Sequence, residues 1–125
     1  MTVNNNFIDI DEEKLIDWNE PNGECYTVSD KITKEGYKVG YMIRKQPVKD
    51  TPDSGWMFIA GNEDEKYLNN EDNFHIFPLN TVCNYDKDII PYLKSDIGSI
   101  YIRINESEFK QSNNKDSIFI SKQKR

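Results

Sequence analysis

Five consecutive apolar residues, 56–60, constrain the fold of this chain more than any other feature of its sequence. A turn signal at residues 53–55 precedes them, and Gly61 follows them. A half-buried strand alternates apolar and polar residues, whereas a short run that is apolar on both faces is typical of a strand inside a covered sheet. We therefore predict that residues 56–60 form a central strand, which pairs antiparallel with the alternating segment 37–45.

The other apolar segments are short and predict a small sheet. Gly40 fits the interior of a strand only where another part of the chain approaches closely. The polar, basic tail at 106–125 holds one apolar triplet, 118–120, which fits either an edge strand or disorder. We predict a single α+β domain over residues 1–125, with a mainly antiparallel sheet of four to six strands and a few short helices on one side. Further strands are predicted at residues 25–28, 74–77 and 99–104.

Side chains that cap helices mark where the short helices begin, because their oxygen atoms accept from free amide groups of the first turn. Leu15 and Trp18 would face the core from the first predicted helix, and a turn at residues 20–23 would end it. The predicted helices are 11–18 capped by Asp11, 29–36 capped by Ser29 or Asp30 and ended by Gly36, 63–68 capped by Asn62, and 89–94 begun by Asp86 or Asp88.

Length and composition narrow the class of protein. A chain of 125 residues is long enough to bury a core without disulfides or metals. Its fifteen aromatic residues (seven Tyr, six Phe, two Trp) argue against a disordered chain. No apolar run approaches the length of a membrane span, and the first residues lack the basic and apolar regions of a signal peptide. We expect a cytoplasmic protein that does not bind membranes.

The residues that carry most enzyme chemistry are scarce. The single histidine, His75, and the two cysteines, Cys25 and Cys83, match no metal-binding spacing. A nucleophilic pair of Cys83 and His75 is conceivable, but an apolar context is typical of an inert core thiol. No glycine-rich phosphate loop is present. We therefore predict no catalytic residues, no metal and no cofactor.

Charge is concentrated in one segment. The net charge is −6, and residues 61–72 carry five acids and one base. Such a surface repels nucleic acid and speeds encounter with basic partners, although acids also simply keep proteins soluble. Aromatic residues flank the segment, and an aromatic anchor ringed by charge is typical of a protein–protein contact. The predicted partner-binding residues are Glu63, Asp64, Glu65, Tyr67, Glu71 and Asp72.

Several sequence blocks, taken in order, resemble a known family. They are EGYKVGYM at 35–42, DSGW at 53–56, GNEDE at 61–65 followed by Tyr67 and Leu68, NF at 73–74, LNT at 79–81, NYD at 84–86, IIPYL at 89–93 and IGS at 97–99. In this order they resemble immunity-protein family thirty-three, earlier filed as a domain of unknown function. The resemblance covers residues 28–103, so the N-terminal segment and the basic tail lie outside it.

The resemblance implies a bacterial protein of a polymorphic toxin system. Such a protein binds and neutralises a protein toxin made by the same cell or a sister cell, and no catalytic residue is carried over. An acidic surface would suit a basic toxin, for example the substrate cleft of a nuclease. The alternative is a small-molecule-binding or regulatory domain, whose pocket would be lined by Trp56, Tyr85 and Tyr92.

Overall fold

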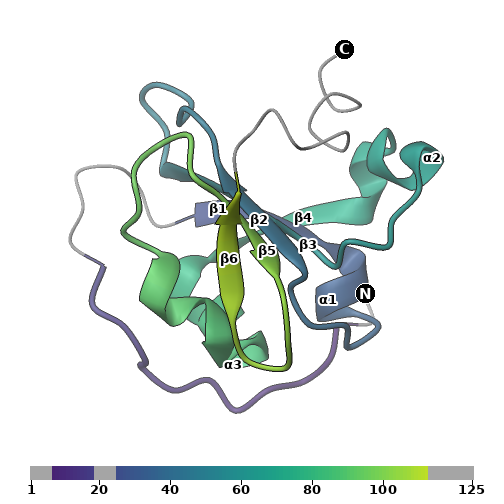
Figure 1. Ribbon diagram of the computed structural model, residues 1–125, viewed down its shortest axis with the longest axis horizontal. Coiled ribbons are helices and arrows are strands. Elements are labelled where there is room, and N and C mark those ends of the chain that lie inside the picture. The colour runs from purple at the N-terminus through teal and green to yellow at the C-terminus, as the bar shows by residue number, and fades with distance from the viewer. Residues whose placement is uncertain (1–6, 19–24, 113–125) are drawn as a thin grey trace, which may run out of the picture.

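The structure of the protein is a computed structural model, and it describes residues 7–18 and 25–112. Its centre is a six-stranded sheet in the order β4-β1-β3-β2-β5-β6 (Figure 1). Only β1 and β3 are parallel, and the other four pairs are antiparallel. The α+β fold with a mainly antiparallel sheet is thus confirmed. The strands are β1 Cys25–Ser29, β2 Tyr41–Arg44, β3 Asp53–Ile59, β4 Phe74–Pro78, β5 Ile100–Arg103 and β6 Phe109–Ser112.

The helices are all short, and they lie between the strands in sequence. No helix of the described chain has the length and apolar character needed to cross a membrane. The α-helices are α1 Asp30–Thr33, α2 Glu65–Leu68 and α3 Leu79–Tyr85, and the 3-10 helices are η1 Glu71–Asn73 and η2 Lys87–Tyr92.

The apolar run forms the central strand that the sequence predicted. β3 has β1 on one side and β2 on the other, and it pairs antiparallel with β2. Trp56 and Phe58 are buried on one face of the sheet, here called the first face. Met57 and Ile59 lie on the opposite, second face. A side chain at Gly40 would place its Cβ 2.0 Å from the carbonyl oxygen of Ala60, which explains the glycine before β2.

The first face holds the larger part of the core. Figure 1 shows α3 and η2 lying together against one side of the sheet. The indole Nε1 of Trp56 donates to the carbonyl oxygen of Leu93 at 2.9 Å, so the polar atom of this buried ring has a partner. The buried side chains of this cluster include Tyr26, Val28, Met42, Trp56, Phe58, Leu79, Val82, Cys83, Ile89 and Leu93.

The N-terminal segment, residues 7–18, contains no helix, so the predicted helix 11–18 is wrong. The segment is instead a strap beside α3, held by two asparagines of that helix. The Oδ1 atom of Asn80 accepts from the amides of Leu15 and Ile16, at 2.7 and 3.2 Å. Asn84 donates to the carbonyl oxygen of Glu13 and accepts from its amide. These bonds satisfy backbone groups that a helix would have satisfied internally.

Several other local predictions need correction. Strand β2 begins only at Tyr41, because the carboxylate of Asp86 takes the amide of Val39 at 2.8 Å before the strand starts. Helix α2 is capped by Asp64 and not by Asn62. The last predicted helix is the 3-10 helix η2, which starts earlier, after its cap Asp86. Helix α3 and strand β6 were not predicted.

The remaining predictions concern helix α1, three strands, and two segments that lie outside the described residues. Ser29 caps α1 as predicted, but the helix ends at Thr33 with Lys34 as its C-cap, so it is shorter than the predicted 29–36. Gly36 has the expected positive φ of 85°, although it lies beyond the helix end. The strands predicted at 25–28, 74–77 and 99–104 correspond to β1, β4 and β5. The predicted turn at 20–23 and the apolar triplet 118–120 lie outside the described residues.

Candidate functional site

The acids predicted to bind a partner lie in or just before α2 and in η1, two short helices that connect β3 to β4 at one end of the sheet (Figure 1). We call residues 64–72 the acidic segment. Four of its side chains are exposed acids, and its one base, Lys66, is also exposed. A small surface thus carries a clear excess of negative charge. The four exposed acids are Asp64, Glu65, Glu71 and Asp72.

Glu63, just before this segment, was predicted to bind a partner, but its side chain is buried and hydrogen-bonded within the domain. It is only 8% exposed, and both of its carboxylate oxygens are engaged. Oε2 accepts from the Ser29 hydroxyl at 2.7 Å and from the amide of Ala60 at 2.8 Å. Oε1 accepts from the amide of Gly61 at 2.8 Å. Glu63 therefore anchors the start of the acidic segment to the ends of β1 and β3, and it leaves no carboxylate oxygen at the surface for a partner.

Side-chain caps hold the acidic segment in one shape. Asp64 Oδ1 accepts from the amide of Tyr67 at 2.8 Å and so begins α2. Asn70 Oδ1 accepts from the amide of Asp72 at 3.0 Å and so begins η1. The Asn73 amide group then donates to the carbonyl oxygen of Tyr67 at 2.9 Å, which ties the two short helices together. A loop held in this way loses little conformational entropy when a partner binds.

Tyr67 is half-buried, so it offers only part of its ring to a partner. Its ring meets that of Phe74 edge to face, with centroids 6.2 Å apart. The Lys31 ammonium lies over the same ring, 5.5 Å from its centroid. Burial raises the pKa of the Tyr67 phenol, so this side chain is neutral at physiological pH. Tyr67 therefore packs between the acidic segment and α1 and does not project freely from the surface.

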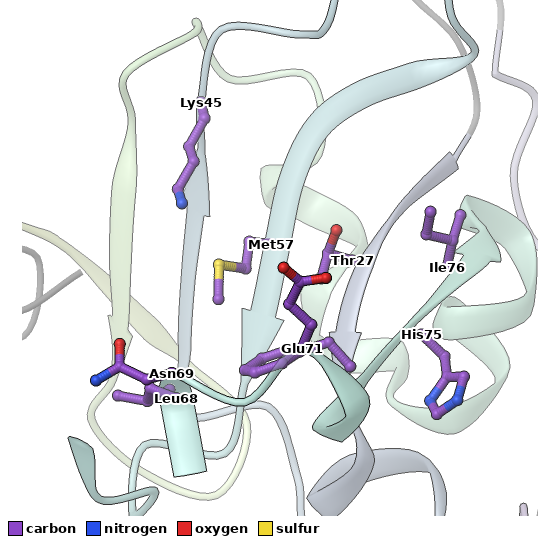
Figure 2. Close-up of a pocket in the computed structure, with 9 residues that line it drawn as sticks. Thr27, Lys45, Met57, Leu68, Asn69, Glu71, His75 and Ile76 are labelled. Carbon is purple, nitrogen blue, oxygen red and sulfur yellow. The ribbon is translucent and has the colours of Figure 1, made fainter. Parts of the chain in front are cut away.

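An open groove of about 390 Å³ lies beside the acidic segment, on the second face of the sheet. Figure 2 shows Thr27 and Met57 on the floor, with Glu71 extending toward them from η1. Lys45, the residue after β2, extends toward the groove, while the His75 ring points away from the floor. Ile76 is 71% exposed on β4, at the far side. The groove therefore combines an apolar floor with charged groups of both signs at its rim.

The nucleophilic pair of Cys83 and His75, which the sequence made conceivable, does not form in the structure. Cys83 is fully buried in α3, and burial raises the pKa of its thiol to about 12. A thiol that stays protonated is a poor nucleophile. His75 is committed elsewhere, because its Nδ1 lies 2.7 Å from Oδ1 of Asp30. The described residues also contain no group of three or more His, Cys, Asp or Glu side chains placed to bind a metal.

The aromatic pocket of the alternative hypothesis is filled by packing. Trp56 is 1% exposed and stacks on Phe58 in the core. The hydroxyl of Tyr85 donates to the carbonyl oxygen of Ile8 in the strap. The hydroxyl of Tyr92 accepts from the amide of Phe109, and its ring packs against that of Phe109. These rings support the first face, so the prediction that they line an open pocket is wrong.

Comparison with known families identifies the chain. Residues 25–113 match the sequence model described as Immunity protein Imm33 domain. The chain belongs to this family. The match runs from the first residue of β1 to just beyond β6, so the Imm33 domain includes the whole sheet and the acidic segment. Comparison with curated proteins and with solved structures gave no match.

The groove of this Imm33 domain was not found from the sequence. Its floor combines Thr27, Met57 and Ile76 from three strands, which the register of β1 with β3 and β4 aligns. The alternation of β4 could have placed Phe74 and Ile76 on one face. It could not have shown which strands lie beside them, because strand order is set by long-range packing.

Proposed function

We propose that this Imm33 protein binds and neutralises a protein toxin, and that the toxin docks on the acidic segment and the adjoining groove. The family supports an immunity role in general. The observation that carries the finer proposal is the group of exposed acids on a segment fixed by Glu63 and by side-chain caps. Inhibition would come from occupancy of a toxin surface and not from catalysis.

Charge would determine the rate of this encounter. A toxin that acts on an anionic substrate, such as a nucleic acid, needs a basic cleft. The exposed acids Asp64, Glu65, Glu71 and Asp72 would attract that cleft over several ångströms, and salt would weaken the attraction. Electrostatic complementarity of this kind raises association rates more than it raises affinity.

The groove would supply the apolar part of the contact. Protein interfaces combine a buried apolar centre with a polar rim, and a few central residues provide most of the binding energy. Here the exposed Ile76 and the half-buried Met57 line the same groove as Glu71. A toxin side chain inserted between them would remove apolar surface from water on both sides. We propose that this contact forms in the cytoplasm.

A capture experiment followed by kinetics tests the proposal. The full chain is immobilised and exposed to lysate of the source organism at low and at high salt, and retained proteins are identified by mass spectrometry. Each captured protein is purified, expressed to test whether it arrests growth, and tested for rescue by co-expression of this chain. A toxin that is rescued is then used to measure association rates with variants of the chain.

The decisive variants change charge equally at two places. The test variant is Glu65→Lys, Glu71→Lys and Asp72→Lys in the acidic segment. The control is Asp9→Lys, Asp11→Lys and Asp96→Lys, which reverses three exposed acids elsewhere. We expect the association rate to fall by about tenfold or more for the test variant alone. An equal fall in both variants, or none in either, would place the toxin elsewhere on the molecule.

A further inference from the structure

The six-stranded sheet has two edges, and their exposed side chains differ. Among the described strands, β4 and β6 each have one neighbour. The exposed residues of β6 are Lys110 and Gln111, and charged side chains on an edge protect it from pairing with another chain. The exposed residues of β4 are Ile76 and Pro78, and the Ile76 side chain is 71% exposed in the middle of the strand. The centre of the β4 edge therefore lacks the protection that β6 has.

The direction of the backbone groups of β1 shows which of them bond to β4. The amide of Cys25 donates to the carbonyl oxygen of Pro52 at 2.8 Å, which lies on the β3 side of β1. The N–H and C=O groups of successive residues point to opposite sides of a strand. The backbone groups of Tyr26 and Val28 therefore face β4.

The same alternation identifies the free backbone groups of β4. The residues paired with Tyr26 and Val28 are Phe77 and His75, so these two bond to β1. Ile76, which lies between them, turns its N–H and C=O away from β1. The N–H of Phe74, two residues earlier, donates to the carbonyl oxygen of Glu71 and not to β1. In the described part of the chain, no loop forms a backbone hydrogen bond with Ile76.

We propose that the toxin adds an extended segment to the edge of β4 and pairs with the free N–H and C=O of Ile76. This inference rests on the proposed function, because it names the part of the toxin that docks beside the acidic segment. Addition of an extended segment to an exposed sheet edge is a common mode of peptide recognition. Backbone hydrogen bonds then supply affinity, and pockets for alternate side chains supply specificity.

Charge favours a toxin segment over a second copy of this chain at the β4 edge. Glu71 and Asp72 are exposed in η1, immediately before β4. The whole chain carries a net charge of −6, so pairing of two copies would bring together two molecules that repel each other. A basic segment is instead attracted to the start of β4.

Two hollows beside Ile76 define the side chains that the segment needs. Ile76 and Thr27 line both of them. The groove described above lies toward η1 and includes Glu71. The other hollow, of about 320 Å³, lies toward the opposite end of β4 and includes Val48 and Pro52. Residues two apart in an extended segment share a face. The toxin segment therefore has an apolar residue opposite Ile76, a base two positions toward η1 and a second apolar residue two positions toward Pro52.

Amide hydrogen exchange tests the pairing at single residues. NMR follows exchange in the full chain alone and in complex with a toxin identified by capture and rescue. The amides of His75 and Phe77 bond to β1 and should stay protected in both states. We expect the Ile76 amide to exchange quickly in the free chain and roughly a hundredfold more slowly in the complex. A bound toxin that leaves this amide unprotected would overturn the pairing and leave the proposed function intact. Capture of no toxin that this chain neutralises would overturn both.

A lysine at the same position gives an independent measurement. Lysine in an edge strand opposes pairing, so we expect Ile76→Lys to raise the Kd for the toxin by about tenfold or more. Ile104→Lys, at an isoleucine that is 57% exposed just after β5, makes the same change of charge and should alter the Kd by less than about twofold. Because both side chains are exposed, the Tm of each variant should stay within about 2 °C of the parent. No loss of affinity, or an equal loss in both variants, would overturn the role of the edge.

Discussion

The two faces of the sheet are closed by different kinds of structure. On the first face, α3, η2 and the strap pack against the sheet, and polar atoms such as the Trp56 indole find partners inside. On the second face, α2 and η1 stand at one end and leave an open groove. The first face therefore holds the larger part of the core, whereas the second face leaves the groove where we propose that a toxin docks.

The largest expected difference in stability is between alanine substitutions at two neighbouring residues of β3, Phe58 and Met57. Phe58 is fully buried on the first face, between Tyr26 and Trp56, whereas Met57 lies half-buried on the second. We expect Phe58→Ala to lower the free energy of unfolding by about 3–5 kcal/mol, since it leaves a cavity among rigid rings. Met57→Ala should cost about 1 kcal/mol or less. Urea denaturation measures both, and similar losses would contradict the division between the faces.

The two cysteines test the same division without changing the sequence. Cys83 lies on the first face, where burial raises its pKa from 9.0 to about 12. At pH 8 its thiolate is then about a thousandfold rarer than that of an ordinary cysteine, because each pKa unit is a factor of ten. Cys25, at the start of β1, is half-buried. We expect a thiol reagent to label Cys25 alone in the native protein and both residues in urea. Equal labelling rates in the native state would show that the first face opens easily.

Two glutamates of the candidate site allow a buried carboxylate to be compared with an exposed one. Glu63 accepts three hydrogen bonds in a buried position, and Glu71 is exposed at the groove. We expect Glu63→Ala to cost about 2–3 kcal/mol, because two backbone amides and a hydroxyl lose their acceptor. Glu71→Ala should change the free energy of unfolding by about 0.5 kcal/mol or less. Thermal and urea unfolding of both variants give the comparison. A small loss for Glu63→Ala would mean that water replaces its carboxylate.

The features that were predicted correctly are those that depend on residues close together in the sequence. The run at 56–60 is apolar on both sides, and it became the strand between β1 and β2. Ser29 can accept from a free amide two residues later, and it caps α1. The resemblance carried by the sequence blocks led to the correct family. Each of these signals depends on neighbouring residues or on a pattern within one segment.

The elements that were missed have long-range causes. Charge alone made Glu63 look like a surface acid, and only the meeting of β1 with β3 brings it the donors Ser29 and Ala60. Helix α3 contains Thr, Val, Cys and two Asn, which are mediocre helix formers. Its core contacts through Leu79 and Val82, and its bonds to the strap, override that weak propensity. The strap in turn remains extended because α3 satisfies its amides.

This mutual dependence of strap and α3 gives the smallest of the expected effects on stability. Asn80→Ala removes the acceptor of the Leu15 and Ile16 amides and the donor to the carbonyl oxygen of Glu13. We expect a loss of about 1–2 kcal/mol, because water can replace part of these bonds near the surface. Asn62→Ala, at an exposed asparagine that does not cap α2, is the matched control and should cost about 0.5 kcal/mol or less.

Hydrogen exchange locates the effect of Asn80→Ala. If the asparagine holds the strap, the amides of Leu15 and Ile16 should exchange faster in the variant, while the amides of β3 keep their protection. Faster exchange throughout the sheet would show instead that the strap and the first face unfold together. In that case the strap unfolds cooperatively with the core. It would then contribute to the stability of the first face together with α3 and η2, and would not be a segment that detaches by itself.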